Sequence, residues 1–299
     1  MQPSYIDIRS VSEVHRYFRC PPPKHPLVSV IDLTTIDPVR PTGEVFHRVD
    51  LYSISCKKFT GTIRYGRSQY DFEEGTLMFT APGQVIASSP DLRVSEGWGL
   101  FFHPDLLHGT ALGANIDSYS FFNYDTNEAL HISEDEKTIL ANCVRSIERE
   151  YGQNIDHHTQ QLIVSNIGLL LNYCTRFYDR QFLTRAKTGN DLVQQFERLL
   201  KARFDGPLIE TGLPDVKYFA ERLNLSPHYL SDLLRKYTGK TTQEYIHLQL
   251  VEKAKTLLWS TARSVSEIAY ELGFEHPSHF TKLFKAKTGR SPTEFRRLN

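Results

Sequence analysis

Basic and hydrogen-bonding side chains gather on two short stretches in the last third of the chain. Lys and Arg neutralise phosphates and release counterions, whereas His, Ser and Asp offer donors and acceptors that distinguish base edges. The pattern therefore suits a double-stranded nucleic acid. The base-reading candidates are His228, Ser231, Asp232, Ser278 and His279. The backbone candidates are Arg235, Lys236, Thr281, Lys282, Lys285, Lys287 and Arg290.

These residues are carried by a sequence that occurs nearly twice, over 216–239 and 265–289. Ala220 matches Ala269, and Gly239 matches Gly289. An internal duplication predicts one supersecondary unit built twice.

Each copy has the pattern of a helix, a turn and a second helix. In the first copy Ser226 suits the N-cap and Pro227 the first position of the second helix, which Gly239 ends as a left-handed cap. In this motif the second helix enters the major groove, N-terminal end first. Between the copies, 243–260 predicts an amphipathic helix that holds them at a fixed separation. The alternative is a pair of plain helical hairpins with solvated charges.

Composition limits the class of protein. The net charge is zero, but residues 190–299 hold 17 Lys and Arg against 13 Asp and Glu, a mildly basic balance. The 4 cysteines are widely spaced, which argues against a disulfide scaffold or zinc ribbon and suits a reducing cytoplasm. We expect neither a signal peptide nor a membrane span.

The region before the repeat changes character near residue 130. Short apolar or aromatic runs separated by Gly, Pro and Asp predict strands within 27–125. Ser133 and Glu136 form a capping-box pattern that starts a helix, and a second helix is expected over about 156–178. This helix pair either packs on its own sheet or joins a partner chain.

The last part of the chain resembles the AraC/XylS-type transcription regulators. The resemblance is carried by Ala220 to Gly239 in the first copy and by Ile268 to Arg296 in the second, and it covers about 192–299. It implies a seven-helix DNA-binding domain and, usually, activation through contact with RNA polymerase.

Two positions depart from the family pattern. Leu250 stands where the family commonly has Arg on the linking helix, so a surface or phosphate contact is expected to be missing. Asp232 stands where the first recognition helix is commonly basic. Its carboxylate is suited either to a cytosine amino group or to an ion pair with Arg235 or Lys236.

The N-terminal region resembles, more loosely, the cupin-type sensor barrel found in this family, on the runs 46–52, 71–79 and 82–84. A small barrel can hold one ligand. The candidate pocket residues, each of which is alternatively ordinary core, are Phe46, His47, Tyr52, Tyr65, Tyr70 and Phe79. His47 lacks the companion ligands of a metal-dependent cupin, and no catalytic triad or phosphate loop is found. We expect no metal, cofactor or catalytic residue.

The expected fold is α+β in two domains: a cupin-like β-barrel with two following helices, then an all-α domain with two helix-turn-helix motifs joined by a long helix. The expected ranges are 1–130 for the barrel, 131–178 for the helices, 179–191 for a linker and 192–299 for the DNA-binding domain. The expected function is a cytoplasmic, sequence-specific transcription regulator controlled by a small effector, with a possible homodimer through 133–178. The alternatives are a constitutive regulator whose barrel only dimerises, and a cupin enzyme with a DNA-binding tail.

Overall fold

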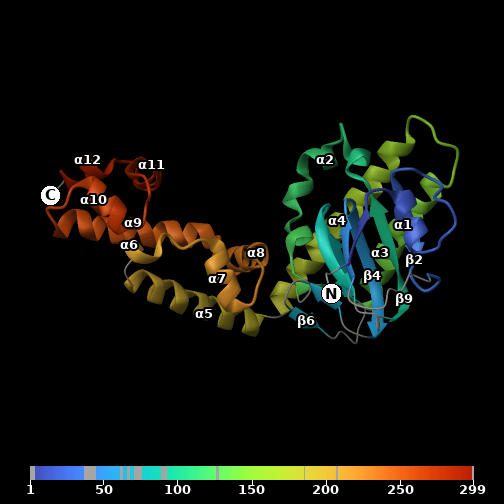
Figure 1. Cartoon of the computed structure of the whole chain (residues 1–299), viewed down its shortest axis with the longest axis horizontal. Coiled ribbons are helices and arrows are strands. Elements are labelled where there is room, and N and C mark those ends of the chain that lie inside the picture. Colours follow the sequence, from blue (N-terminus) through green and yellow to red (C-terminus); the bar gives the residue numbers. More distant parts are fainter. Residues whose placement is uncertain are drawn as a thin grey trace. The chain divides into compact units, whose positions relative to one another are not determined.

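The structure is a computed structural model that describes residues 4–36, 45–60, 63–65, 68–70, 76–88, 93–125, 128–184, 186–206 and 208–297 (Figure 1). The chain divides into two compact units, Met1–Thr184 and Arg185–Asn299. The first is rich in strands and the second is helical, as the sequence predicts.

Two five-stranded sheets form the frame of the first unit. The first sheet has the order β1 (Ser4–Ile8), β3 (Val45–Val49), β8 (Gln84–Ser88), β5 (Ile63–Tyr65) and β6 (Ser68–Tyr70). The second has the order β10 (Leu130–His131), β7 (Thr76–Thr80), β4 (Tyr52–Thr60), β9 (Arg93–Phe102) and β2 (Val28–Asp32). Among the described strands both sheets are open, so closure into the expected barrel is not seen in this part of the chain.

The strand prediction was wrong at both ends of its range. The chain begins with β1 and with α1 (Val11–Tyr17), whose N-cap Ser10 accepts a hydrogen bond from the Glu13 backbone N–H. After Phe102 it forms short helical turns: η1 (Pro104–Leu107), α2 (Ala111–Asn115), η2 (Ile116–Ser118) and η3 (Ser120–Asn123). Thr110 caps α2 by accepting from the Gly113 N–H at 3.1 Å. A local cap of this kind favours helix over strand.

The helix pair of the first unit packs on that unit's own strands. α3 (Glu134–Tyr151) begins with the predicted capping box of Ser133 and Glu136 and contacts β2. α4 (Thr159–Thr184) contacts α3 and β10, and it runs six residues beyond the predicted end at 178. Packing against the sheet buries one face of each helix, including Ile147 and Ile167.

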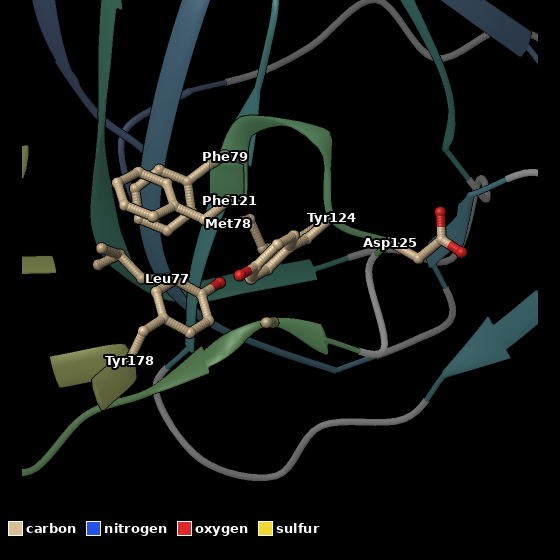
Figure 2. Close-up of a pocket in the computed structure, with 8 residues that line it drawn as sticks. Leu77, Met78, Phe79, Phe121, Tyr124, Asp125 and Tyr178 are labelled. Atoms are coloured by element: carbon tan, nitrogen blue, oxygen red, sulfur yellow. The ribbon is translucent and has the colours of Figure 1, made fainter. Parts of the chain in front are cut away.

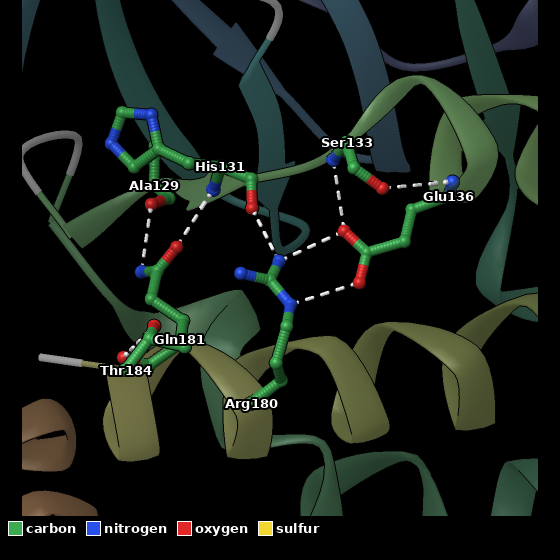
Figure 3. A network of polar contacts seen from close by, with 7 residues as sticks. All are labelled: Ala129, His131, Ser133, Glu136, Arg180, Gln181 and Thr184. Carbon is green, nitrogen blue, oxygen red and sulfur yellow. Dashed lines mark hydrogen bonds and ion pairs between the residues drawn. The ribbon is translucent and has the colours of Figure 1, made fainter.

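A polar network explains why α4 continues into the range expected to be a linker (Figure 3). The Arg180 guanidinium donates to both carboxylate oxygens of Glu136 at 2.9 Å and to the His131 carbonyl at 2.7 Å. Gln181 accepts from the His131 N–H at 2.8 Å and donates to the Ala129 carbonyl at 3.3 Å. These bonds fix the last turns of α4 to β10 and to the start of α3.

Eight helices form the described part of the second unit. They are α5 (Ala186–Asp205), α6 (Leu208–Thr211), α7 (Val216–Leu223), α8 (Pro227–Thr238), α9 (Thr242–Ser260), α10 (Val265–Glu271), α11 (Pro277–Thr288) and α12 (Pro292–Arg296). The pairs α7–α8 and α10–α11 lie in the two repeated ranges. One contiguous core joins both pairs through α9, with Phe196, Phe219 and Phe284 fully buried. The two copies therefore share a single core.

Leu250 explains one of the two departures from the family pattern. Its side chain is buried in the shared core, on the same face of α9 as Ala254 and Leu258. A position inside the core has no access to a phosphate. The apolar residue therefore contributes packing rather than a surface contact.

Candidate nucleic-acid interface

The two copies repeat one another down to single hydrogen bonds. Thr238 donates its hydroxyl to the Leu234 carbonyl at 2.7 Å, and Thr288 donates to the Phe284 carbonyl at 2.8 Å. The backbone turns left-handed at Gly239, with φ of 76°, and at Gly289, with φ of 77°. An offset of 50 residues thus superposes α8 on α11, and their outward faces are comparable position by position.

The turn inside each copy uses different residues for the same geometry. Asn224 takes a left-handed φ of 54° in the first copy, and Gly273 takes 85° in the second. Beyond the turn, the Leu225 N–H donates to the Ala220 carbonyl and the Phe274 N–H to the Ala269 carbonyl, both at 3.0 Å. Asn tolerates this backbone region better than most residues, so a glycine is not required there.

The outward face of α8 is partly engaged in contacts within the protein. His228 is exposed at the N-terminal end of the helix. Ser231 is half-buried and donates to the Thr242 hydroxyl at 3.2 Å. Asp232 forms an ion pair with Arg235 at 3.8 Å, one of the two pairings that the sequence suggested. Lys236 is exposed.

The outward face of α11 carries more positive charge than that of α8. Ser278, His279, Lys282 and Lys285 are exposed, as are Lys287 and Arg290 at the far end. Thr281 is half-buried, and its hydroxyl donates to the Pro277 carbonyl at 3.0 Å. Within the described part of the chain, none of the four cations makes an ion pair. Between its ends, α11 carries three Lys and no acidic residue, whereas α8 carries Asp232 beside Arg235 and Lys236.

The start of α9 lies near basic residues from both α8 and α11. The hydrogen bond from the Thr241 backbone N–H is the main reason that the pKa of Glu244 is lowered, and Lys287 and Arg235 add to it. Burial lowers the pKa of His247, and the nearby Lys287 lowers it further. A ring nitrogen of His247 is hydrogen-bonded to the Gln243 amide at 2.7 Å. Lys287 at the end of α11 thus acts on both Glu244 and His247 at the start of α9.

Two residues of this surface were missed by sequence reasoning. Lys240 is exposed and stands 50 residues before Arg290, but the repeat was followed only as far as Gly239. Extending the same offset by one residue would have found it. His247 was missed because its proximity to Lys287 depends on the packing of α11 against α9.

The candidate pocket residues of the first unit are divided between its sheets. Phe46 and His47 lie on β3, where His47 is buried with its ring edge-on to Tyr17 at 4.9 Å between centroids. Tyr52 on β4 and Phe79 on β7 both contact Phe122 of η3, at 5.0 and 5.6 Å between ring centroids. Tyr65 and Tyr70 lie on β5 and β6, and their side chains are outside the described part.

A small aromatic cavity adjoins Phe79 (Figure 2). Phe121, Tyr124 and Tyr178 line it, and the rings of Phe121 and Tyr178 stack at 5.4 Å. Its volume is about 10 Å³, which is room for roughly one water molecule. An organic ligand of several heavy atoms therefore requires these rings to move apart.

No group of three or more His, Cys, Asp or Glu side chains that would hold a metal ion is present among the described residues. In the same part of the chain, every helix is too short or too polar to cross a bilayer.

Comparison with known proteins identifies a domain in the last part of the chain. The family described as "Helix-turn-helix domain" matches residues 219–298. The HTH-type transcriptional regulator YijO of Escherichia coli is 26% identical over 75% of this chain and 78% of its own length. The transcriptional activator RhaS of Salmonella arizonae is 39% identical over 77 residues, which are 26% of this chain and 28% of RhaS.

A solved structure is also similar to part of this chain. The C-terminal domain of AraT, a response regulator from Geobacillus stearothermophilus, is 28% identical and covers 36% of this chain and 85% of that domain, with a TM-score of 0.33. The family match and the curated relatives agree with the two helix pairs described above. Residues 219–298 therefore form a helix-turn-helix domain of the AraC type, and the curated relatives that share it are HTH-type transcriptional regulators.

Proposed function

We propose that this protein is a sequence-specific regulator whose two helix pairs occupy adjacent major grooves of one DNA duplex. The observation that carries the proposal is that two equivalent helices, α8 and α11, share one core and each present exposed side chains. The connecting α9 has 19 residues and is therefore about 28 Å long. Adjacent major grooves on one face of the duplex are roughly 34 Å apart, so one rigid unit has the reach to contact both.

Within this proposal the N-terminal ends of the two helices read bases. His228, Ser278 and His279 are exposed at these ends and offer hydrogen bonds to base edges. Ser231 and Asp232 also lie on the reading face, although each has a partner within the protein. The basic residues contribute affinity by contacting phosphates. Thr281 is an uncharged contact to the DNA backbone, and Lys240 is a further basic one.

We assign effector binding to the β-rich unit, among the aromatic side chains that surround Tyr52 and Phe79. The support is the recess beside Phe79, which is lined largely by aromatic side chains. Opening the recess requires the rings of Phe121 and Tyr178 to separate. Binding of a ligand would therefore be coupled to a movement of these two side chains. The cupin-like barrel and the pocket roles of Phe46, His47, Tyr65 and Tyr70 belong to this proposal.

Homodimerisation through 133–178 is the proposed role of the outer face of α4. Leu162 and Leu169 stand seven residues apart on one helical face, and 44% and 48% of their surfaces are exposed. Two large apolar side chains at this spacing suit a helix from a second copy. Cytoplasmic location and contact with RNA polymerase are likewise proposed.

The proposal is tested by selecting the fragments of the source genome that the purified protein retains. We expect a small set of fragments that share a motif, and their retardation should weaken steeply with salt. A failure to retain any fragment at low salt, with the protein shown to be folded, would contradict DNA binding. Thermal shifts across a metabolite panel test the effector, because a ligand that binds the native state stabilises it by mass action.

A further inference from the structure

One position of the two recognition helices carries opposite charge. The offset of 50 residues places Asp232 of α8 on Lys282 of α11, and Arg235 on Lys285. The backbone around these positions is the same in both copies, as the matching Thr238 and Thr288 bonds show. The reversal is therefore a property of the side chains alone.

Asp232 brings a carboxylate close to its own helix's cation. The Arg235 guanidinium lies 3.8 Å from the Asp232 carboxylate, one turn along the helix. The Arg235 side chain is 64% exposed and that of Asp232 is 23% exposed, so the pair sits at the surface rather than in the core. Lys285 has no such neighbour, since position 282 is itself a lysine.

Arg235 and Lys285 each also lie near a glutamate of the following helix. Arg235 lies near Glu244 at the start of α9, and Lys285 lies near Glu294 at the start of α12. Both glutamates close capping boxes, with Thr241 and Ser291. Each cation thus lies near one equivalent carboxylate from the next helix, and Arg235 also pairs with Asp232.

We propose that Asp232 makes the first helix pair a cytosine-selective reader by holding Arg235 back from DNA that lacks cytosine at its position. This rests on the DNA binding proposed above. On an unrelated sequence, the carboxylate faces phosphates without a hydrogen-bond donor and keeps Arg235 in the ion pair. On the correct sequence, the cytosine N4 amino group donates to Asp232, and Arg235 turns to a phosphate. Sequence-independent affinity then comes mainly from α11.

The expected magnitude is small for the backbone and larger for the base. Each phosphate neutralised adds about 0.9 to the slope of log affinity against log salt, which is roughly a threefold change between 50 and 200 mM salt. A bidentate or well-placed base contact discriminates by roughly 5- to 150-fold. An exposed ion pair is weak enough for a donor on the DNA to replace it.

The test compares Asp232→Asn with Glu252→Gln, a matched control that removes the carboxylate of another exposed i, i+3 pair, with Lys255. Binding is measured on the best enriched fragment, on that fragment with each base pair replaced in turn, and on unrelated DNA, at several salt concentrations. For D232N we expect tighter binding to unrelated DNA, a salt slope larger by about 0.9, and a weaker cytosine preference at one position, because the neutral Asn oxygen is a poorer acceptor than the carboxylate. E252Q should behave as wild type.

Arg235→Ala in both backgrounds completes the test. It should reduce the salt slope on unrelated DNA more in D232N than in the wild type, because only there is Arg235 released. An unchanged slope and an unchanged base preference in D232N would overturn the inference while wild-type binding leaves the proposed function intact. If the wild type binds no DNA, the proposed function itself fails. Should D232N misfold, Asp232→Ala and Asp232→Lys give the same readouts.

Discussion

Replacing glycine by alanine should lower the free energy of unfolding at two positions of this chain, Gly239 and Gly289, and raise it at a third, Gly168. Gly239 and Gly289 end α8 and α11 with φ of 76° and 77°, and a Cβ built on either would meet no heavy atom within 4 Å. Gly168 lies inside α4, and its Cβ would likewise meet nothing within 4 Å. Packing therefore contributes little at any of these sites, and the backbone conformation decides the sign.

The magnitudes follow from the backbone alone. A left-handed conformation costs an L-residue roughly 1–2 kcal/mol, and alanine recovers part of this by restricting the unfolded chain. We expect Gly239→Ala and Gly289→Ala each to lower the free energy of unfolding of the second unit by about 1 kcal/mol. Gly168→Ala should raise that of the first unit by roughly 0.5–1 kcal/mol, because glycine is unfavourable inside a helix.

The two tryptophans allow each unit to be followed separately. Trp98 lies on β9 in the first unit, and Trp259 lies on α9 in the second, stacked on Phe295 at 5.2 Å. Urea unfolding in a Trp98→Phe background reports the second unit, and unfolding in a Trp259→Phe background reports the first. Stabilisation by G239A or G289A, or clearly unequal effects of the two, would refute the claim that both copies end in the same left-handed turn.

Three further outcomes follow from the structure. Replacing Lys282 or Lys285 by Ala should weaken binding to all DNA sequences alike, and each change should lower the salt slope by about 0.9. Titrations at several salt concentrations measure both effects. A loss of affinity confined to one sequence would contradict a phosphate role. Burial lowers the pKa of Lys57 from 10.5 to about 8, so the unfolded chain binds more protons than the folded chain between these pH values. The free energy of unfolding of the wild type should therefore rise with pH over that window relative to that of K57M. Parallel pH profiles of the two proteins would contradict this prediction. A Cβ at Gly189 would lie 2.2 Å from the ring of Tyr237, so Gly189→Ala should destabilise the second unit by roughly 1–3 kcal/mol. The loss of stability should be smaller in a Tyr237→Ala background. Equal losses in both backgrounds would show that this contact is not the cause.

Local signals were sufficient for much of the second unit and for the start of α3 in the first. The caps at Ser226 and Gly239 and the Ser133 capping box depend only on neighbouring residues, and the sequence placed all three correctly. The repeat also located both helix pairs, because the spacing of core residues is set by the helical period. Boundaries were weaker where a tertiary contact decides them, as for Arg180, whose bonds to Glu136 and His131 extend α4.

The orientation of individual side chains on the reading surface was beyond the sequence. Ser231 was assigned to the outward face, yet its hydroxyl is bonded to Thr242 of the next helix. Leu250 was interpreted as a lost surface contact, and its burial became visible only with the core that α9 completes. The β-rich unit was predicted by class only, since strand pairing and the local caps after Phe102 depend on contacts distant in sequence.

The central claim is that one protein unit contacts two adjacent major grooves at once, and changing the spacing of the enriched DNA site tests it directly. The two half-sites should lie about one helical turn, roughly 10 base pairs, apart. Inserting five base pairs between them turns one half-site to the opposite face of the duplex. We predict that the affinity then falls to that of a fragment with a single half-site. An affinity that the insertion leaves unchanged would contradict simultaneous reading by α8 and α11.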